Sequence, residues 1–463
     1  MILRSSIGSL LALLLLVTAC GNGPSWLRKD KSDKDKKNST SAPEVTQTGL
    51  VENPAYNTAL VNNNELIMGV NLTSWLNAGH HGRSMTIAIL DNGFGGLKNS
   101  LGTRLPPGLA VAKPVIDNES TTPHGTKLAE VIFAMTSGSP AWTAASQHPT
   151  IKLYNSNGFT NFSAAVDNAI TEHVDMILYS QVWEFGGNFD GRGFINAVVD
   201  KATSAGILWV NAAGNYGQSA WQGALVANAD QTALLPYLGK YVRLVVNEKS
   251  TAVKISLAWN DFADSKDWRT SRDLDLVLLD ASMKRVAIGN LIQDGQDHSK
   301  DPKYSAHARE SIETTLDPGT YLLRVDIKSQ NFDTYSRIRL ASDGARISFM
   351  DQSADASVMI PADNPSVLTV GASDEGSSSA GRTATGLQKP EVVAPSTINF
   401  EGGIGFKGSS SAAAVAAGAL AVFQDVCGRQ NRDMIVYGIN SGLLSQLSTV
   451  GRGFWMPEGV RCQ

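Results

Sequence analysis

One serine, Ser410, stands where a helix of small residues is expected to begin, in the stretch from Gly408 to Gly418. Gly408 permits a tight turn that a Cβ atom would obstruct, and residues 412–419 are mostly alanine, which favours a closely packed helix. The N-terminus of a buried helix has a positive potential and N–H groups that point out of the helix end. A serine there suits a nucleophilic attack that creates an oxyanion, although an ordinary serine-rich turn has the same local pattern.

Two further side chains with catalytic chemistry are placed by their neighbours. Asp91 ends the apolar run 85–90, which predicts a buried parallel strand, and open α/β sheets build their sites at the carboxyl ends of such strands. His124, next to Gly125, begins a helix-like segment that would face the same edge. Each also has a structural interpretation, Asp91 as an Asx-turn residue and His124 as an ordinary core histidine.

Together these residues resemble the signature blocks of subtilisin-like serine peptidases, in the chain order Asp, His, Ser that subtilisin uses. The blocks are Asp91-Asn-Gly, His124-Gly-Thr, Gly408-Ser-Ser-Ser-Ala and, around the family's oxyanion-hole asparagine, Leu208-Trp-Val-Asn-Ala-Ala-Gly-Asn215. Lesser blocks match at 174–180, 361–372 and 389–395, so the resemblance spans most of residues 70–220 and 355–425.

The resemblance implies a serine endopeptidase that acts on proteins or peptides and needs no cofactor for catalysis. Ser410 would attack the peptide carbonyl, His124 would take its proton, and Asp91 would hold the imidazole in the right tautomer. The Asn215 amide and the backbone N–H of Ser410 would stabilise the oxyanion. The substrate would bind as an added strand in a cleft lined by Ser180, Gln181, Val182, Ala212, Ala213 and Gly214. Gln181 and Val182 replace the family's usual Leu-Gly, which predicts a narrowed pocket for the side chain before the cut.

The flanks of the catalytic blocks depart from the family pattern at Asn92, Lys127, Glu130, Ser409, Ala414 and Val415. No catalytic group is lost, but the departures leave open a catalytically weak or dead relative that binds peptides or partners. An unrelated α/β lipase or esterase is the third alternative. Such enzymes place the serine in Gly-x-Ser-x-Gly and use the order Ser, Asp, His, and neither feature marks Ser410.

The N-terminus predicts a targeting segment. Arg4 precedes the apolar run 10–17, which is too short for a membrane span. The next residues, Val17-Thr-Ala-Cys20, resemble the bacterial lipobox, in which the cysteine is lipidated; a plain secretory signal is the alternative. We expect an exported protein that is lipid-anchored through Cys20 to a bacterial membrane. Because Gly21 and not Asp follows the cysteine, this is the outer membrane if the host is Gram-negative.

The two other cysteines, Cys427 and Cys462, are a candidate disulfide in an oxidising compartment, with two buried thiols as the alternative. A 42% hydrophobic content with 18% charged residues is typical of a folded protein. The net charge of −4, without a large block of like charge, argues against a nucleic-acid partner.

The order of the predicted elements gives an α/β fold, a subtilisin-like parallel sheet flanked by helices, with an inserted antiparallel β-sandwich. We expect six short alternating strands between Tyr241 and Leu340, with a turn at Asp317-Pro-Gly. The predicted parts are a signal peptide at 1–20, a flexible tether at 21–65, the catalytic domain at 66–220 and 351–426, the sandwich at 221–350 and a C-terminal extension at 427–463.

The inserted sandwich has its own alternating apolar pattern, so we expect it to bury its own core and to be separable from the catalytic domain. Asp273, Asp275 and Asp280 offer oxygen ligands for a structural Ca²⁺. Solvated acidic positions without a metal are the alternative, and they are the commoner outcome of such a pattern.

Overall fold

The structure is a computed structural model, and it describes residues 60–107, 109–111, 122–137, 147–235, 238–343, 346–353, 357–448, 450–459 and 462. The predicted signal peptide, the lipobox with Cys20, and the tether up to residue 59 lie outside the described residues.

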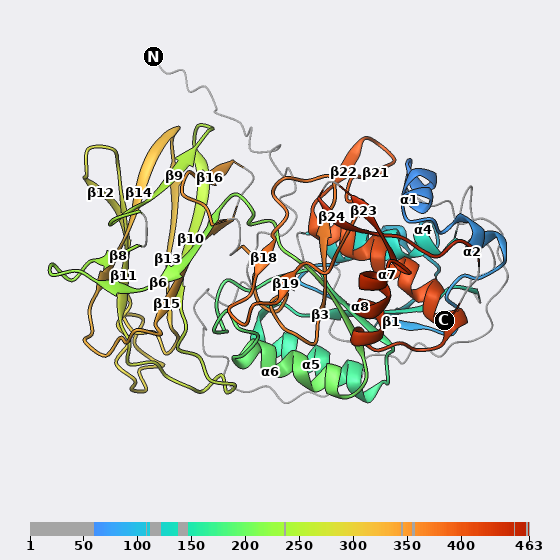
Figure 1. Cartoon of the computed structure of the whole chain (residues 1–463), viewed down its shortest axis with the longest axis horizontal. Coiled ribbons are helices and arrows are strands. Elements are labelled where there is room, and N and C mark those ends of the chain that lie inside the picture. Colours follow the sequence, from blue (N-terminus) through green and yellow to red (C-terminus); the bar gives the residue numbers. More distant parts are fainter. Residues whose placement is uncertain are drawn as a thin grey trace, which may run out of the picture.

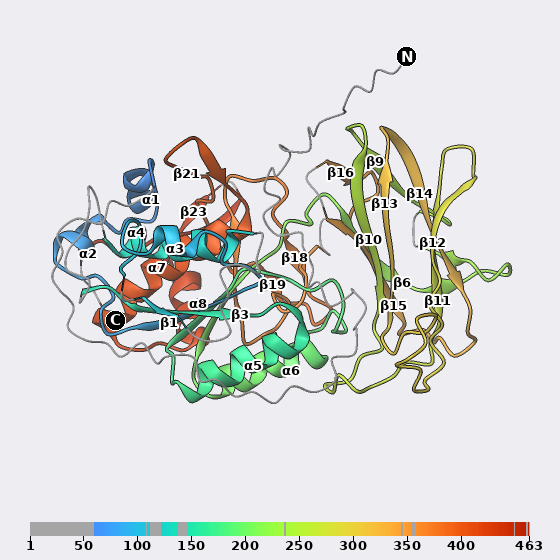
Figure 2. The ribbon, with the colours of Figure 1, turned by 180° about the vertical axis from the view of Figure 1, so that it is seen from behind.

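A nine-stranded sheet forms the centre of the catalytic part of the molecule (Figures 1 and 2). Its strands, in spatial order, are β2 (Ala110–Val111), β3 (Thr150–Asn155), β1 (Thr86–Asp91), β4 (Met176–Tyr179), β5 (Leu208–Ala212), β17 (Leu368–Ala372), β20 (Val392–Ala394), β24 (Gly451–Phe454) and β23 (Ser445–Ser448). Every neighbouring pair is parallel except β24 and β23. The expected parallel sheet is therefore present.

The central strands are buried on both faces, which explains their continuous apolar runs. In β1, Ile87 and Ile89 point into one apolar cluster, while Ala88 and Leu90 point into another on the opposite face. The first cluster is covered by α4 (His124–Ser137), α7 (Ser409–Cys427) and the short α1 (Asn63–Gly69). The second is covered by α5 (Gly158–Thr171) and α6 (Phe194–Ser204), which lie below the sheet in Figure 1. The remaining helices are α2 (Thr73–Asn77), α3 (Leu97–Ser100) and α8 (Arg432–Ser441).

Helix α7 is long and apolar enough to cross a membrane, and it is the one such helix among the described residues. Its composition has a different explanation here, because 83% of its most hydrophobic window is buried. Gly418 shows how close the packing is, since a Cβ atom there would lie 2.7 Å from the Cβ atom of Met135 on α4. The small residues of α7 therefore serve its burial between α4 and the sheet.

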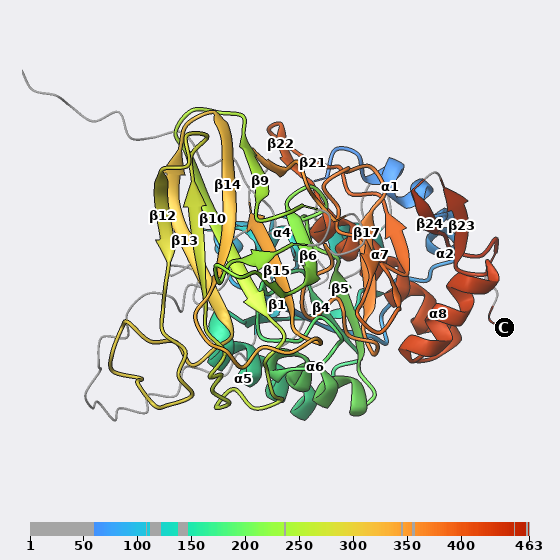
Figure 3. The ribbon, with the colours of Figure 1, turned by 60° about the vertical axis from the view of Figure 1, so that its left-hand side comes forward.

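The insert consists of two antiparallel sheets whose strands run side by side (Figures 1 and 3). The four-stranded sheet is β13 (Arg309–Leu316), β10 (Thr251–Trp259), β15 (Arg337–Asp343) and β6 (Ala220–Ala224). The five-stranded sheet is β12 (Arg285–Gly289), β11 (Leu274–Leu279), β14 (Gly319–Ile327), β9 (Val242–Val246) and β16 (Ile347–Phe349). The six predicted segments lie in or overlap β9, β10, β11, β13, β14 and β15.

Four two-residue strands and two three-residue strands form hairpins outside these sheets. They are β7 (Val226–Ala227) with β8 (Ala233–Leu234), β18 (Gly381–Arg382) with β19 (Gln388–Lys389), and β21 (Ile398–Phe400) with β22 (Ile404–Phe406).

The apolar core of the insert is continuous with one apolar cluster of the catalytic part, and the expectation of a separable module stays a prediction. One apolar cluster runs from the α5 and α6 face of the main sheet into the interior of the sandwich. Trp183, Phe194 and Ile360 from the catalytic part join Leu257 and Phe262 from the insert in this cluster. The alternation along each strand indicates which residues are buried, but it does not indicate which residues they pack against. This shared core could therefore not be predicted from the sequence pattern.

Both ends of the catalytic domain extend beyond the predicted boundaries. Residues 60–65, assigned to the flexible tether, are part of the fold, because Leu60 is buried and pairs with Phe400 and α1 begins at Asn63. At the other end, the predicted C-terminal extension supplies α8, the edge strand β23, and β24, which lies between β23 and β20. Exposed backbone at a sheet edge is a ready pairing site, and β24 uses it by pairing with β20.

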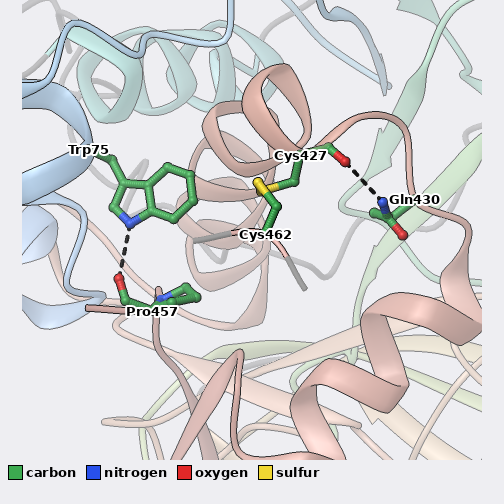
Figure 4. Close-up of a disulfide and its surroundings, with 5 residues drawn as sticks. All are labelled: Trp75, Cys427, Gln430, Pro457 and Cys462. Carbon is green, nitrogen blue, oxygen red and sulfur yellow. Dashed lines mark hydrogen bonds between the residues drawn. A yellow bond between two sulfur atoms is a disulfide. The ribbon is translucent and has the colours of Figure 1, made fainter. Parts of the chain in front are cut away.

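A disulfide joins Cys427, at the end of α7, to Cys462 near the C-terminus (Figure 4). Beside it the indole Nε1 of Trp75 donates to the carbonyl oxygen of Pro457 at 3.0 Å, and the Gln430 amide donates to the Cys427 carbonyl oxygen at 3.2 Å. The disulfide holds the last segment of the chain to the end of α7, and the hydrogen bond from Trp75 holds the same segment to α2.

Candidate active site

The catalytic candidates meet at the carboxyl ends of neighbouring strands. Asp91 is the last residue of β1, Ser180 follows β4, and Asn215 follows β5. The strands are parallel and in register, with Leu90 opposite Tyr179 and Tyr179 opposite Asn211. Their ends therefore lie along one edge of the sheet, where α/β proteins place their sites.

Asp91 and His124 form a direct pair. The Nδ1 atom of His124 lies 2.6 Å from Oδ2 of the fully buried Asp91, and the backbone N–H of Gly93 donates to Oδ1 of the same carboxylate. A carboxylate accepts hydrogen bonds only, so the imidazole presents its Nδ1–H to Asp91 and carries its lone pair on Nε2. The edge of the Phe406 ring packs against the imidazole, with the ring centroids 5.4 Å apart.

Gly125 allows His124 to approach Asp91 this closely. A Cβ atom at position 125 would lie 2.8 Å from the Cβ atom of Asp91 and 2.8 Å from the carbonyl oxygen of Gly93, inside the range that real contacts avoid. The same carbonyl oxygen accepts a hydrogen bond from the Gly125 N–H. The glycine thus brings the start of α4 against the end of β1, as its place next to His124 predicts.

Ser410 is the second residue of α7 and is buried. Its hydroxyl donates to the carbonyl oxygen of Ser180 at 3.0 Å, and the Ser180 hydroxyl donates in return to the Ser410 carbonyl oxygen at 3.4 Å. This exchange joins the first turn of α7 to the segment that follows β4. The N–H groups of a first helical turn point out of the helix end, and Ser410 belongs to the first turn of α7.

The orientation of the Asn215 amide is fixed by Ser409. Its Oδ1 atom accepts from the Ser409 N–H at 3.0 Å and from the Ser409 hydroxyl at 3.1 Å, and the same hydroxyl accepts from the Gly214 N–H at 3.0 Å. With its oxygen held in this way, the amide presents Nδ2 as its donor. Gly408 has φ +109°, and a Cβ atom there would lie 2.7 Å from Nδ2. Glycine is therefore required both by the backbone and by the space.

The predicted substrate-cleft residues do not have the same exposure. Gln181 is partly exposed, whereas the side chains of Val182, Ala212 and Ala213 are buried. Ala212 belongs to the main apolar cluster, and the Ala213 N–H donates to the carbonyl oxygen of Val370. Gly214 has no side chain to offer. A bound peptide could therefore contact Ala212, Ala213 and Gly214 mainly through their backbone groups.

Val182 packs in a small buried cluster with Tyr216 and Met359 of the catalytic part and with Ala220 and Ala341 of the insert. The side chain that replaces the family's usual glycine is thus part of the contact between the two parts of the chain. The narrowed pocket for the side chain before the cut stays a prediction.

Lys127, one helical turn after His124, is buried beside two aromatic rings. Its Nζ atom lies 5.6 Å from the ring centroids of Phe400 and Phe406. Burial lowers the pKa of Lys127, and the nearby Glu130 carboxylate opposes that shift. Glu130 itself accepts from the Ser100 hydroxyl. Lys127 and Glu130, the two departures from the family pattern in the histidine block, are thus both buried on α4, and their opposite charges interact.

Two functional candidates were missed by the sequence argument, Glu184 and Tyr216. Glu184 is buried, and it accepts hydrogen bonds from Tyr216, Lys254 and Ser256. The available signal was a single acidic residue in the aromatic stretch Val182-Trp-Glu-Phe185. Buried carboxylates are rare unless they are paired.

The acidic residues proposed for calcium do not converge on one point. Asp280 accepts hydrogen bonds from the backbone of Ser282 and Lys284 in a tight turn, and Asp275 pairs with Lys328 at 3.4 Å. Burial, followed by the charge of Asp275, raises the pKa of Asp273 to about 6. In the part of the chain that the structure describes, no three His, Cys, Asp or Glu side chains are placed to hold a metal ion.

Comparisons with known proteins agree with the fold. The structure of the Clostridium perfringens CspB protease is similar, with a TM-score of 0.52, 14% sequence identity, and coverage of 88% of this chain and 96% of that chain. The fold is subtilisin-like. A model of the subtilase family matches residues 325–436, a segment that contains Ser410 but neither Asp91 nor His124. The family match and the shared fold support a serine peptidase that acts on proteins or peptides.

A second solved structure, the pre-peptidase C-terminal domain of a collagenase from Bacillus anthracis, has a TM-score of 0.17 and 16% identity. It covers 27% of this chain and 89% of its own, and a similarity this low supports no argument. No curated protein matches this sequence.

Proposed function

We propose that this protein is a subtilisin-like serine endopeptidase in which Ser410 is the nucleophile, His124 the general base and Asp91 the residue that orients and stabilises the imidazole. The supporting observation is the 2.6 Å pair of His124 Nδ1 and Asp91 Oδ2 at the same sheet edge as Ser410 and Asn215. A merely structural histidine does not need a buried carboxylate, a nucleophile candidate and an oriented amide beside it.

The reaction then follows from the chemistry of these groups. Ser410 Oγ attacks the carbonyl carbon of the scissile peptide and passes its proton to His124 Nε2. Asp91 stabilises the resulting imidazolium, while Asn215 Nδ2 and the Ser410 N–H donate to the oxyanion. The imidazolium returns the proton to the leaving amine as the C–N bond breaks. Water, activated by His124, then hydrolyses the acyl-enzyme and restores the Ser410 hydroxyl.

Ser410→Ala tests this assignment, with Ser411→Ala as the matched control. Ser411 is the next residue of α7, and its hydroxyl is engaged by the carbonyl oxygens of Ser396 and Gly408. We expect Ser410→Ala to lose about 10⁶-fold in kcat on a peptide library, which is the loss caused by removing the serine of a subtilisin triad. Ser411→Ala should retain most of the activity. Equal cleavage by purified wild type and Ser410→Ala would exclude Ser410 as the nucleophile. An inactive wild type would instead favour the peptide-binding alternative.

We also propose that Cys20 is lipidated and anchors the exported protein to a bacterial membrane, which is the outer membrane if the host is Gram-negative. The proposal is supported by the short apolar run before Val17-Thr-Ala-Cys20, which resembles a lipobox. Acyl chains on Cys20 would anchor the protein, because each buried CH₂ group of a chain contributes about 0.8 kcal/mol and further chains add to it. Cys20→Ser should lose palmitate labelling and move from the membrane to the soluble fraction. A variant that remains membrane-bound to the same extent would contradict a lipid anchor.

A further inference from the structure

A buried carboxylate connects the insert to the catalytic part of the chain. Glu184 lies four residues after Ser180, in the segment that receives the Ser410 hydrogen bond, and its side chain is 4% exposed. Its Oε2 atom accepts from the Lys254 ammonium at 2.6 Å and from the Ser256 hydroxyl at 2.5 Å. Both donors are on β10 of the insert. The carboxylate is thus held by two donors that belong to the inserted sandwich.

The other oxygen of the same carboxylate reaches the oxyanion side of the site. Glu184 Oε1 accepts from the Tyr216 hydroxyl at 3.1 Å. Tyr216 is adjacent to Asn215 in sequence and is buried, and its backbone N–H donates to the Ser379 hydroxyl at 2.9 Å. Its ring packs against Val182 and Met359 and against Ala220 and Ala341 of the insert. Tyr216 is therefore fixed at its hydroxyl, its ring and its backbone.

The charges around Glu184 explain why a carboxylate is needed at this position. Lys254 is within 2.6 Å, and the Arg309 guanidinium on β13, which lies 4.3 Å over the Phe185 ring, also interacts with the Glu184 charge. Removing one partner of a buried ion pair leaves the other charge uncompensated, which costs more than the pair itself contributes. A neutral residue at 184 would leave two cations of the insert facing the catalytic part.

We propose that Glu184 is a positioning residue through which strand β10 of the insert holds Tyr216, and with it the Asn215 amide, in the orientation that stabilises the oxyanion. The proposal rests on the proposed function and adds to it a role for the insert. An oxyanion donor is effective only when its geometry is held tightly, and a displacement of about 1 Å costs on the order of 10²-fold in rate. In this proposal the insert acts on the reaction through Glu184 and Tyr216.

Tyr216→Phe tests the link with the smallest change, because it removes one hydroxyl and keeps the buried ring. We expect kcat to fall about ten-fold with little change in KM, since the oxyanion forms only after substrate is bound. Tyr321→Phe is the matched control, because the hydroxyl of Tyr321 on β14 donates to the Asp317 carbonyl oxygen at an exposed turn. On β10, Lys254→Met should lower kcat in the same way, and Lys254→Arg should restore most of it.

A double-mutant cycle separates positioning of Asn215 from a general loss of stability. In the Asn215→Ala background the amide is absent, so Tyr216→Phe should change kcat by less than about two-fold. If Tyr216→Phe lowered kcat ten-fold in both the wild-type and the Asn215→Ala background, the proposal would be overturned. It would also be overturned if the variant's apparent melting temperature fell far enough to account for the lost activity. Wild type that cleaves no peptide and leaves Ser410 unlabelled by a fluorophosphonate would overturn the proposed function itself. Wild type that is labelled, with an additive cycle, would overturn only the role of Glu184.

Discussion

The buried carboxyl group of Glu310 on the insert should make the stability of the protein depend on pH. Glu310 is on β13, is 1% exposed, and accepts from the Gln293 amide at 2.7 Å. Burial raises its pKa from the ordinary 4.5 to about 8, and the hydrogen bond from Gln293 only partly opposes this shift. The folded protein therefore retains a proton on Glu310 through a pH range in which the unfolded chain releases it.

Because the pKa of Glu310 is higher in the folded than in the unfolded state, the protein should lose stability as the pH rises. Below about pH 4.5 Glu310 is protonated in both states and has no effect, and as the pH rises the unfolded state gains from ionisation while the folded state does not. The free energy of unfolding thus falls by about 1.4 kcal/mol per pH unit until the folded group ionises near pH 8, a total on the order of 5 kcal/mol. This value is an upper limit, because the protein can relax around the charge.

Glu310→Gln removes the ionisation and keeps an acceptor for Gln293. We expect the apparent melting temperature of the variant, relative to wild type, to rise steadily between pH 5 and pH 8 and to level off above that. Glu313→Gln, an exposed glutamate on the same strand, is the control and should show no such trend. A difference between Glu310→Gln and wild type that stays constant from pH 5 to pH 9 would refute the buried, protonated carboxyl.

Two further substitutions test the site and the C-terminal segment. Asn215→Ala should lower kcat by about 10²–10³-fold with little change in KM, and steady-state kinetics that show only a higher KM would mean that Asn215 binds substrate instead. Replacing Cys427 and Cys462 by serine opens a loop with a sequence separation of 35, so thermal denaturation should show a loss of about 3–4 kcal/mol; an unchanged melting temperature would mean that the disulfide does not constrain the unfolded chain.

The parallel sheet, and the position of Asp91 at the end of its strand, were predictable because their sequence signals are local. The run 85–90 is apolar throughout since β1 is buried on both faces, and Asp91 follows it because the strand ends at the site edge. Gly125 and Gly408 were informative for the same reason: each lies where the backbone of one element closely approaches another. In the insert, alternation along β10 and β14 reports a half-buried surface.

The connections between distant parts of the chain were not predictable from these patterns. Glu184 and Lys254 are separated by 70 residues, and nothing in either neighbourhood indicates the other. The pairing of β24 with β20 depends on an open sheet edge, which only the assembled sheet reveals. Likewise, the apolar residues of the insert indicate burial, but the structure was needed to show that they share a core with α5 and α6.

The most direct test of the central claim is the site and rate of labelling by a fluorophosphonate, followed by peptide mass spectrometry. We predict a single adduct on the peptide that contains Ser410, no adduct in Ser410→Ala, and labelling slowed by at least about 10³-fold in His124→Ala, since the imidazole activates the hydroxyl. An adduct on another residue, or equal labelling rates in wild type and His124→Ala, would contradict the account.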